Sequence, residues 1–334
     1  MKLQLLGLIL LGAICSSTLA AQITLSKKVI ATLQKKDDSL KYYGGFIMGG
    51  GKDTVRAVAD SIFTKILVRA LVIPNSYKFN FDSAVTISKV VAPDNSFRIF
   101  TWQLMLNEDF FIQRGVIQIN TADGSPKLFP LYDRSSSLKK LDDSVRNNNN
   151  WVGALYYKII AKTIQGNPAF ILIGLDRNNA KTDKKWIDVL RFNPLGKPEF
   201  GAQIFNFSKD TGKVQKYKPY RFGIEYKKDA RVRMNFDEDL NLIVYDHLDS
   251  EEEATNTNKK TFVPDGNYEA FEWKNEELVH IPNLYDYKAM PGDIPQGSLL
   301  DDDNSTELIK ASEKNLEKEK AEKKLKPKNP KRSK

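Results

Sequence analysis

The chain has 334 residues, with 51 Lys or Arg against 42 Asp or Glu, which gives a net charge of +9. This length is sufficient for one large domain or two ordinary ones. Outside the C-terminal end, the positive charges are spread without a dense cluster, which argues against a nucleic-acid groove. We therefore expect no nucleic-acid partner.

Residues 1–20 have the pattern of a secretory signal peptide. Lys2 precedes an uncharged apolar run, and small residues stand at Thr18 and Ala20. The run is too short for a spanning helix, which needs about 20 apolar residues. A lipoprotein is the alternative because Cys15 follows the run, although Ile14 stands where a lipidation signal needs Gly or Ala. We expect an exported protein, periplasmic or secreted, with association to the cell envelope as an open alternative.

Cys15 is the sole cysteine, so removal of the signal peptide would leave no disulfide, thiolate nucleophile or Cys metal ligand. At the other end, residues 301–334 are rich in Lys and Glu and poor in large apolar side chains. Such a segment cannot bury enough apolar surface to offset its ordering entropy, so we expect a disordered tail. Its basic end would suit contact with anionic surfaces, while a solvated tail is the simpler interpretation.

Between these ends, residues 21–52 form a mixed lead-in segment that ends in a glycine-rich stretch. A nucleotide-binding P-loop is not expected there, because Phe46 stands where that motif needs Gly and Asp53 where it needs Ser or Thr. Residues from Asp53 to near Pro74 have helical periodicity, with Asp53 as the expected N-cap.

The rest of the body, up to residue 300, has the pattern of successive strands joined by turns. Asp123-Gly124 indicates a hairpin, and a polar break at 134–150 could divide the body in two. The segments expected as strands are 97–106, 116–119, 128–129, 151–161, 169–175, 186–192, 200–207, 221–226, 231–236, 240–245, 268–273 and 278–280. We predict a mainly β fold with one N-terminal helix (α+β), whose antiparallel meander forms a curled, barrel-like or sandwich-like body.

The histidines, His247 and His280, lack any metal-ligand spacing. Asp246-His247 could belong to a hydrolase triad, but adjacent strand residues point to opposite faces and no nucleophile motif is present. A histidine that closes a turn at a strand end is therefore the preferred interpretation. We expect no metal site, no cofactor and no catalytic residue.

The aromatic residues say more about a possible binding site than the histidines do. They suit either core packing or a platform for a sugar or peptide, and exposure would distinguish these roles. The candidate ligand-binding residues are Trp151, Tyr157, Trp186 and Trp273.

Several segments together resemble a group of uncharacterised exported proteins of Bacteroidetes-type Gram-negative bacteria. These segments are SFRIFTW at 96–102, WVGALYYKII at 151–160, GLDRNNAKTDKKWIDVLRFNPLGKPEFG at 174–201, IVYDHL at 243–248 and FVPDGNYEAF at 262–271. The resemblance covers roughly residues 38–275 and implies a shared scaffold. It implies no activity, substrate or catalytic residue.

The sequence thus leaves the function unknown, with three hypotheses. The first is a non-catalytic exported protein of the cell envelope that binds a partner or polymer, either glycan or protein. The second is a hydrolase with an acid-based site, which a cleft lined by several acids would favour. The third is a carbohydrate-binding module, which an exposed row of Trp and Tyr would favour.

Overall fold

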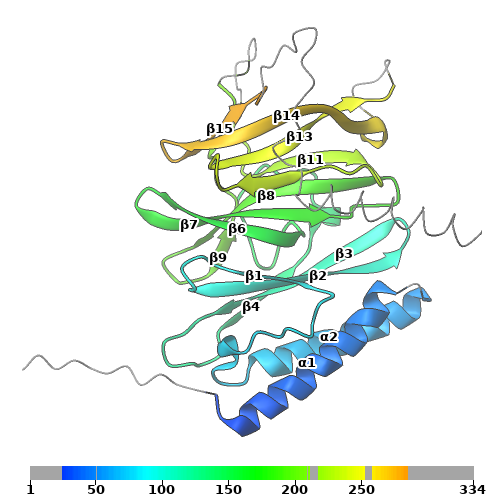
Figure 1. Ribbon diagram of the computed structural model, residues 1–334, viewed down its shortest axis with the longest axis vertical. Helices are drawn as coiled ribbons and strands as arrows, with labels where there is room; N and C mark the ends of the chain where they lie inside the picture. Colours follow the sequence, from blue (N-terminus) through cyan, green and yellow to red (C-terminus); the bar gives the residue numbers. More distant parts are fainter. Residues whose placement is uncertain (1–24, 50, 209, 211–216, 253–257, 285–334) are drawn as a thin grey trace, which may run out of the picture. The chain divides into compact units, whose positions relative to one another are not determined.

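The computed structural model describes residues 25–49, 51–208, 210, 217–252 and 258–284 (Figure 1). The predicted signal peptide and the predicted tail at 301–334 lie outside these ranges. The first elements are the helices α1 (Lys27–Met48) and α2 (Asp53–Leu71). The strands are β1 (Ser88–Val91), β2 (Phe97–Asn107), β3 (Phe110–Ile119), β4 (Leu128–Tyr132), β5 (Arg146–Asn147), β6 (Leu155–Ile164), β7 (Asn167–Asp176), β8 (Thr182–Phe192), β9 (Pro198–Phe200), β10 (Phe205–Asn206), β11 (Phe222–Lys227), β12 (Met234–Asp237), β13 (Leu242–Ser250), β14 (Phe262–Lys274) and β15 (Glu277–Ile281).

The N-terminal part contains two helices, so the prediction of one was wrong. The segment expected as a lead-in contains α1, whose first turn is capped by Ser26. Its buried face includes Asp37, which accepts hydrogen bonds from the backbone N–H groups of Ser83 and Ala84 at 2.8 and 3.1 Å. The helix predicted from Asp53 is present as α2, although Lys52 rather than Asp53 is its N-cap.

The strands form three separate sheets. The first has the order β1-β2-β3-β4, the second β5-β9-β8-β7-β6 with β11 paired to β8, and the third β10-β15-β14-β13-β12. All pairings are antiparallel except that of β10 with β15. The mainly β prediction is therefore confirmed, whereas the predicted curled or barrel-like body is wrong, because none of the sheets formed by the described residues is closed or curled.

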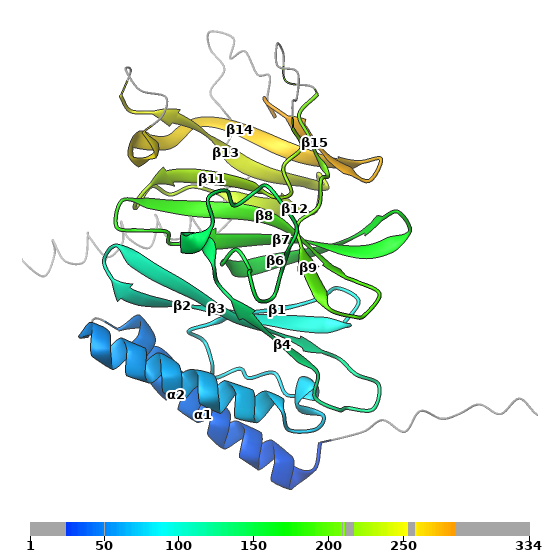
Figure 2. The same ribbon diagram turned by 180° about the vertical axis from the view of Figure 1, so that it is seen from behind.

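Three apolar cores explain why the sheets stack instead of closing (Figures 1 and 2). One core joins the helices to the first sheet, the next joins the first and second sheets, and the third joins the second and third sheets. Strand β7 contributes to two of them, since Phe170 and Leu172 face the first sheet while Ile171 and Ile173 face the third. A sheet that is apolar on both faces must be covered on both.

The polar break at 134–150 lies between β4 and β6, and a buried arginine donates hydrogen bonds to its backbone. Arg221 donates hydrogen bonds to the carbonyl oxygens of Leu141, Ser144 and Phe200. Its Nε lies 3.3 Å from Oδ2 of Asp188, and both side chains are buried. Residues before and after the break share one core, which includes Phe97 and Phe170.

Candidate functional site

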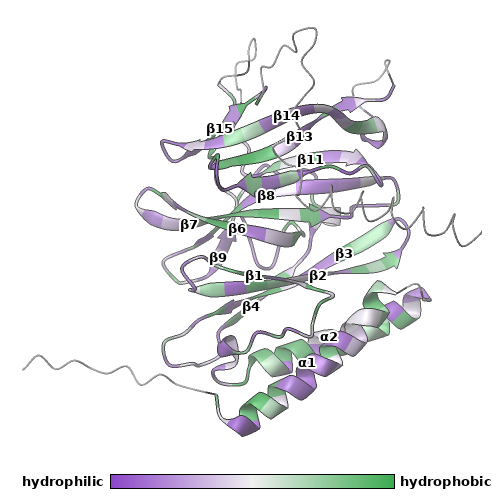
Figure 3. Cartoon of the chain, viewed as in Figure 1, coloured by the Kyte–Doolittle hydropathy of each residue, from purple (hydrophilic) through white to green (hydrophobic). Residues whose placement is uncertain are grey.

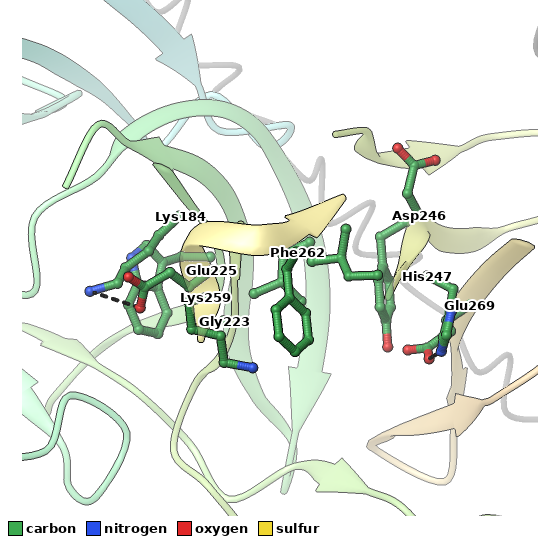
Figure 4. Close-up of a pocket in the computed structure, with 12 residues that line it drawn as sticks. Lys184, Gly223, Glu225, Asp246, His247, Lys259, Phe262 and Glu269 are labelled. Carbon is green, nitrogen blue, oxygen red and sulfur yellow. Dashed lines mark ion pairs between the residues drawn. The ribbon is translucent and has the colours of Figure 1, made fainter. Parts of the chain in front are cut away.

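A cleft of about 350 Å³ lies where the second and third sheets meet, and we call it the β8–β14 cleft (Figure 4). The ion pair of Lys184 with Glu225 lies on one side of Phe262, together with Lys259. His247 and Glu269 lie on the other side. The residues that line the cleft are Lys184, Trp186, Gly223, Ile224, Glu225, Tyr245, Asp246, His247, Leu248, Lys259, Phe262 and Glu269.

The pairing of β8 with β11 builds one wall of this cleft. It places Trp186 opposite Gly223 and Lys184 opposite Glu225. A Cβ atom at residue 223 would lie 2.4 Å from the Trp186 ring, so only glycine lets the indole lie across β11. Lys184 Nζ then lies 3.6 Å from Glu225, which also accepts hydrogen bonds from Thr182 and Asn178.

The other wall carries an alternating series of acids and imidazoles, which we call the carboxylate–histidine chain. Nδ1 of His247 lies 2.8 Å from Asp265, and its Nε2 lies 3.7 Å from Glu269. The second oxygen of Glu269 lies 3.1 Å from Nε2 of His280, whose Nδ1 lies 2.7 Å from Asp210. Both histidines of the sequence therefore share Glu269.

Burial and hydrogen bonding oppose one another along this chain. Burial alone would lower the pKa of His280, but the hydrogen bonds with Glu269 and Asp210 raise that pKa above its ordinary value. Burial would likewise raise the pKa of Glu269, yet the hydrogen bonds from His280 and Tyr245 lower it. Both shifts favour the charged form of the group concerned.

The charged side chains of the cleft differ in how they are paired. Glu225 has Lys184, Glu269 has the histidines, and Asp246 accepts a hydrogen bond of 2.6 Å from the backbone N–H of Arg233. The Lys259 ammonium lies 3.9 Å from the centroid of the Phe262 ring and has no ion pair among residues 25–284 where the structure describes them.

A second cleft, of about 460 Å³, also has Lys184 in its lining, and we call it the Asp176 cleft. Burial raises the pKa of Asp176 to about 6. Its Oδ1 accepts hydrogen bonds from the Gln113 amide and the Asn178 N–H at 3.0 and 2.9 Å. Asp133, also in this cleft, accepts hydrogen bonds from the backbone of Gln113, Ser135 and Gly153 and from the Ser135 hydroxyl.

The four aromatic residues proposed from sequence do not form one exposed row. Trp151 is fully buried and donates its indole N–H to the Tyr156 hydroxyl at 2.8 Å. Trp186 is buried, although its edge lines the β8–β14 cleft. Tyr157 is 38% exposed on β6, where its hydroxyl donates to the carbonyl of Met234, and Trp273 is half-buried on β14 under Lys162.

Asp246 and His247 do not pair with one another, in agreement with their predicted opposite directions. The expected position of His247 in a turn at a strand end was wrong, because His247 lies inside β13 at the bulge between Asp246 and Leu248, where the register against β14 shifts. Sequence reasoning missed Glu269, which the same register places opposite Tyr245. It also missed Lys184, Lys259 and Asp176, since only the folded chain brings them to the clefts.

Among the described residues, no group of three or more His, Cys, Asp or Glu is arranged to hold a metal ion. No helix in the described part of the chain has the length and apolar character needed to cross a membrane. No family model, curated protein or solved structure matches this chain.

Proposed function

We propose that this chain is an exported, non-catalytic binding protein of the cell envelope that holds a segment of an acidic partner or polymer in the β8–β14 cleft. The observation that carries the proposal is the exposed Lys259 ammonium at that cleft. Glu225 and Glu269 have cationic neighbours, while the Lys259 ammonium lies over the Phe262 ring and has no ion pair among the described residues. A carboxylate or phosphate on a ligand would complete the pairing.

The lining also supports a polymer segment rather than a small ion. Phe262 and Trp186 offer apolar surface beside Lys184 and Lys259, and a cleft of about 350 Å³ is within the usual size range of ligand sites. The signal-peptide pattern and the resemblance to exported proteins support the envelope as the place of action.

A thermal-shift series tests this function. The chain is heated with a carboxylated polysaccharide, a phosphorylated polymer, a neutral glucan or peptidoglycan fragments. An acidic polymer should raise the melting temperature in a concentration-dependent way, and the neutral glucan should not. Equal shifts with acidic and neutral polymers, or no shift with any of them, would contradict the proposal.

A hydrolase with an acid-based site is the second candidate, and the Asp176 cleft favours it. There a carboxyl group whose pKa is raised to about 6 shares a cleft with Asp133, which is bonded as an acceptor. Two acids in different environments are what general acid–base catalysis uses. Turnover of an envelope polysaccharide that disappears in Asp176→Asn would support this candidate, and turnover that persists would remove it.

A further inference from the structure

Three polar side chains lie on one face of the third sheet, on strands that carry both hydrophobic and hydrophilic residues (Figure 3). Strand register places Tyr245 opposite Glu269 and His280 opposite Phe271. Glu269 and Phe271 are two residues apart on β14, so all four side chains share that face. Tyr245 and His280 are buried, and their polar atoms must therefore find partners within the fold.

Both ring nitrogens of His280 face a carboxylate. Nδ1 lies 2.7 Å from Asp210, and Nε2 lies 3.1 Å from Glu269. An ionised carboxylate only accepts hydrogen bonds, and a neutral imidazole has a single N–H group to donate. The two contacts are therefore satisfied together only when His280 carries a proton on each nitrogen.

The hydroxyl of Tyr245 makes a second arrangement possible, because it lies 2.8 Å from Nε2 of His280 and also hydrogen-bonds to Glu269. While Nε2 carries a proton, the hydroxyl can donate only to Glu269. Once Nε2 has lost its proton, the hydroxyl can donate to the ring instead. Nδ1 has no such donor among the described residues, so loss of its proton would set a lone pair against Asp210. A neutral ring should therefore keep its proton on Nδ1.

We propose that His280 is a pH-sensitive switch in the hydrogen bonding of Glu269, an inference independent of which ligand the β8–β14 cleft binds. With His280 protonated, Glu269 accepts hydrogen bonds from Nε2–H and from the Tyr245 hydroxyl. With His280 neutral, the hydroxyl donates to the ring and Glu269 loses both donors. A carboxylate without donors is costly to keep in the interior. Glu269, which lines the cleft, then turns toward the solvent there.

The other titratable groups around the switch do not take over the lost donors. Nε2 of His247 lies 3.7 Å from Glu269, but Nδ1 of that ring faces Asp265 at 2.8 Å and donates to it, so a neutral His247 has no second N–H group. Burial opposes the charged form of His280, yet the hydrogen bonds with Glu269 and Asp210 raise its pKa above the ordinary value of 6.5. The switch therefore acts as the pH rises beyond 6.5.

Nuclear magnetic resonance of the full chain tests the switch without any ligand. The histidine rings carry a nitrogen label and the glutamate carboxyl groups a carbon label, and the pH is raised from acid to mildly alkaline values. We expect His280 to pass from the doubly protonated ring to the Nδ1–H form, in about tenfold excess over the other tautomer. The carboxyl signal of Glu269 should shift at the same pH, well above its own titration.

Tyr245→Phe removes the hydroxyl and should reduce the tautomer excess about tenfold. The matched control is Tyr157→Phe, which removes a hydroxyl bonded to the carbonyl of Met234 and should leave the excess unchanged. A neutral His280 with its proton on Nε2 would overturn the inference, and so would a Glu269 signal that does not move when His280 titrates. Both outcomes are measured in the unchanged chain, so they decide the inference even if Tyr245→Phe folds poorly.

Discussion

The imidazole Nε2 of His280 lies 3.1 Å from the carboxylate of Glu269, and this pair joins the interior of the third sheet to the β8–β14 cleft. The hydroxyl of Tyr245 lies 2.8 Å from the same ring nitrogen and also hydrogen-bonds to Glu269. The site wall is therefore held by charge-assisted hydrogen bonds, whose strength depends on pH.

Glu269→Gln should reduce stability most between pH 4.5 and 6.5. Because the pKa of Glu269 is lowered, its contribution to stability is present above pH 4.5 and is lost as the pH falls further. Because the pKa of His280 is raised, its contribution to stability is full below pH 6.5 and is lost as the pH rises further. We expect a loss of about 1–2 kcal/mol in that window, measured by urea unfolding at several pH values. A loss that does not change with pH would contradict this coupling; Glu238→Gln, at an exposed ion pair, is the control.

Two adjacent glycines of α1 should respond in opposite directions to the same change. A Cβ at Gly44 would lie 2.0 Å from the Thr86 hydroxyl, so Gly44→Ala should destabilise the chain by about 1–3 kcal/mol. Gly45→Ala meets open space and should stabilise it by about 0.5–1 kcal/mol. Chemical unfolding of the two variants measures these effects on stability. Effects of the same sign would contradict the packing of α1 against Thr86.

Replacing only one partner of the buried Arg221–Asp188 pair should lower the free energy of unfolding strongly. Arg221→Met leaves Asp188 uncompensated and frees the carbonyl groups of Leu141 and Phe200, so we expect a loss of about 3–5 kcal/mol. The double variant Arg221→Met/Asp188→Leu should recover part of that loss because no buried charge remains. A double-mutant cycle by chemical unfolding measures the coupling, and additive losses would show that the two groups do not interact.

Asp176→Asn should change how stability depends on pH. Burial raises the pKa of Asp176 from 3.8 to about 6, so the stability of the unchanged chain should fall as pH rises through this range. Asparagine keeps the acceptor for Gln113 and Asn178 and removes the buried charge. At pH 7 the variant should be more stable, on the order of 2 kcal/mol. A variant less stable at pH 7 than at pH 4, relative to the unchanged chain, would refute the raised pKa.

Local patterns predicted much of the strand content. The segment 97–106 is β2, 169–175 lies within β7, and the Asp123-Gly124 turn separates β3 from β4. Helix α1 was missed because Asp37 and Gly44 interrupt its apolar face, and their roles depend on Ser83 and Thr86, which lie far along the chain. The unbroken apolar run of β7 did carry a signal of burial on both faces, which could have indicated stacked layers.

The clefts were less accessible to sequence reasoning than the fold. His247 and Asp265, or Lys184 and Glu225, are far apart in the chain, and only strand register brings them together. The aromatic residues were visible as a class, but their sequence context does not distinguish buried Trp151 from Tyr157 at the surface.

The most direct test of the proposed acidic ligand compares Lys259→Gln with Lys260→Gln by titration calorimetry against the acidic polymer that gives the largest thermal shift. Lys259 lines the β8–β14 cleft, whereas its exposed neighbour Lys260 does not, and both changes remove one positive charge from the chain. We predict that Lys259→Gln weakens binding about tenfold, in line with the loss of one charge-assisted contact, and that Lys260→Gln leaves it nearly unchanged. Equal affinities for the two variants would contradict the assignment of the ligand to this cleft.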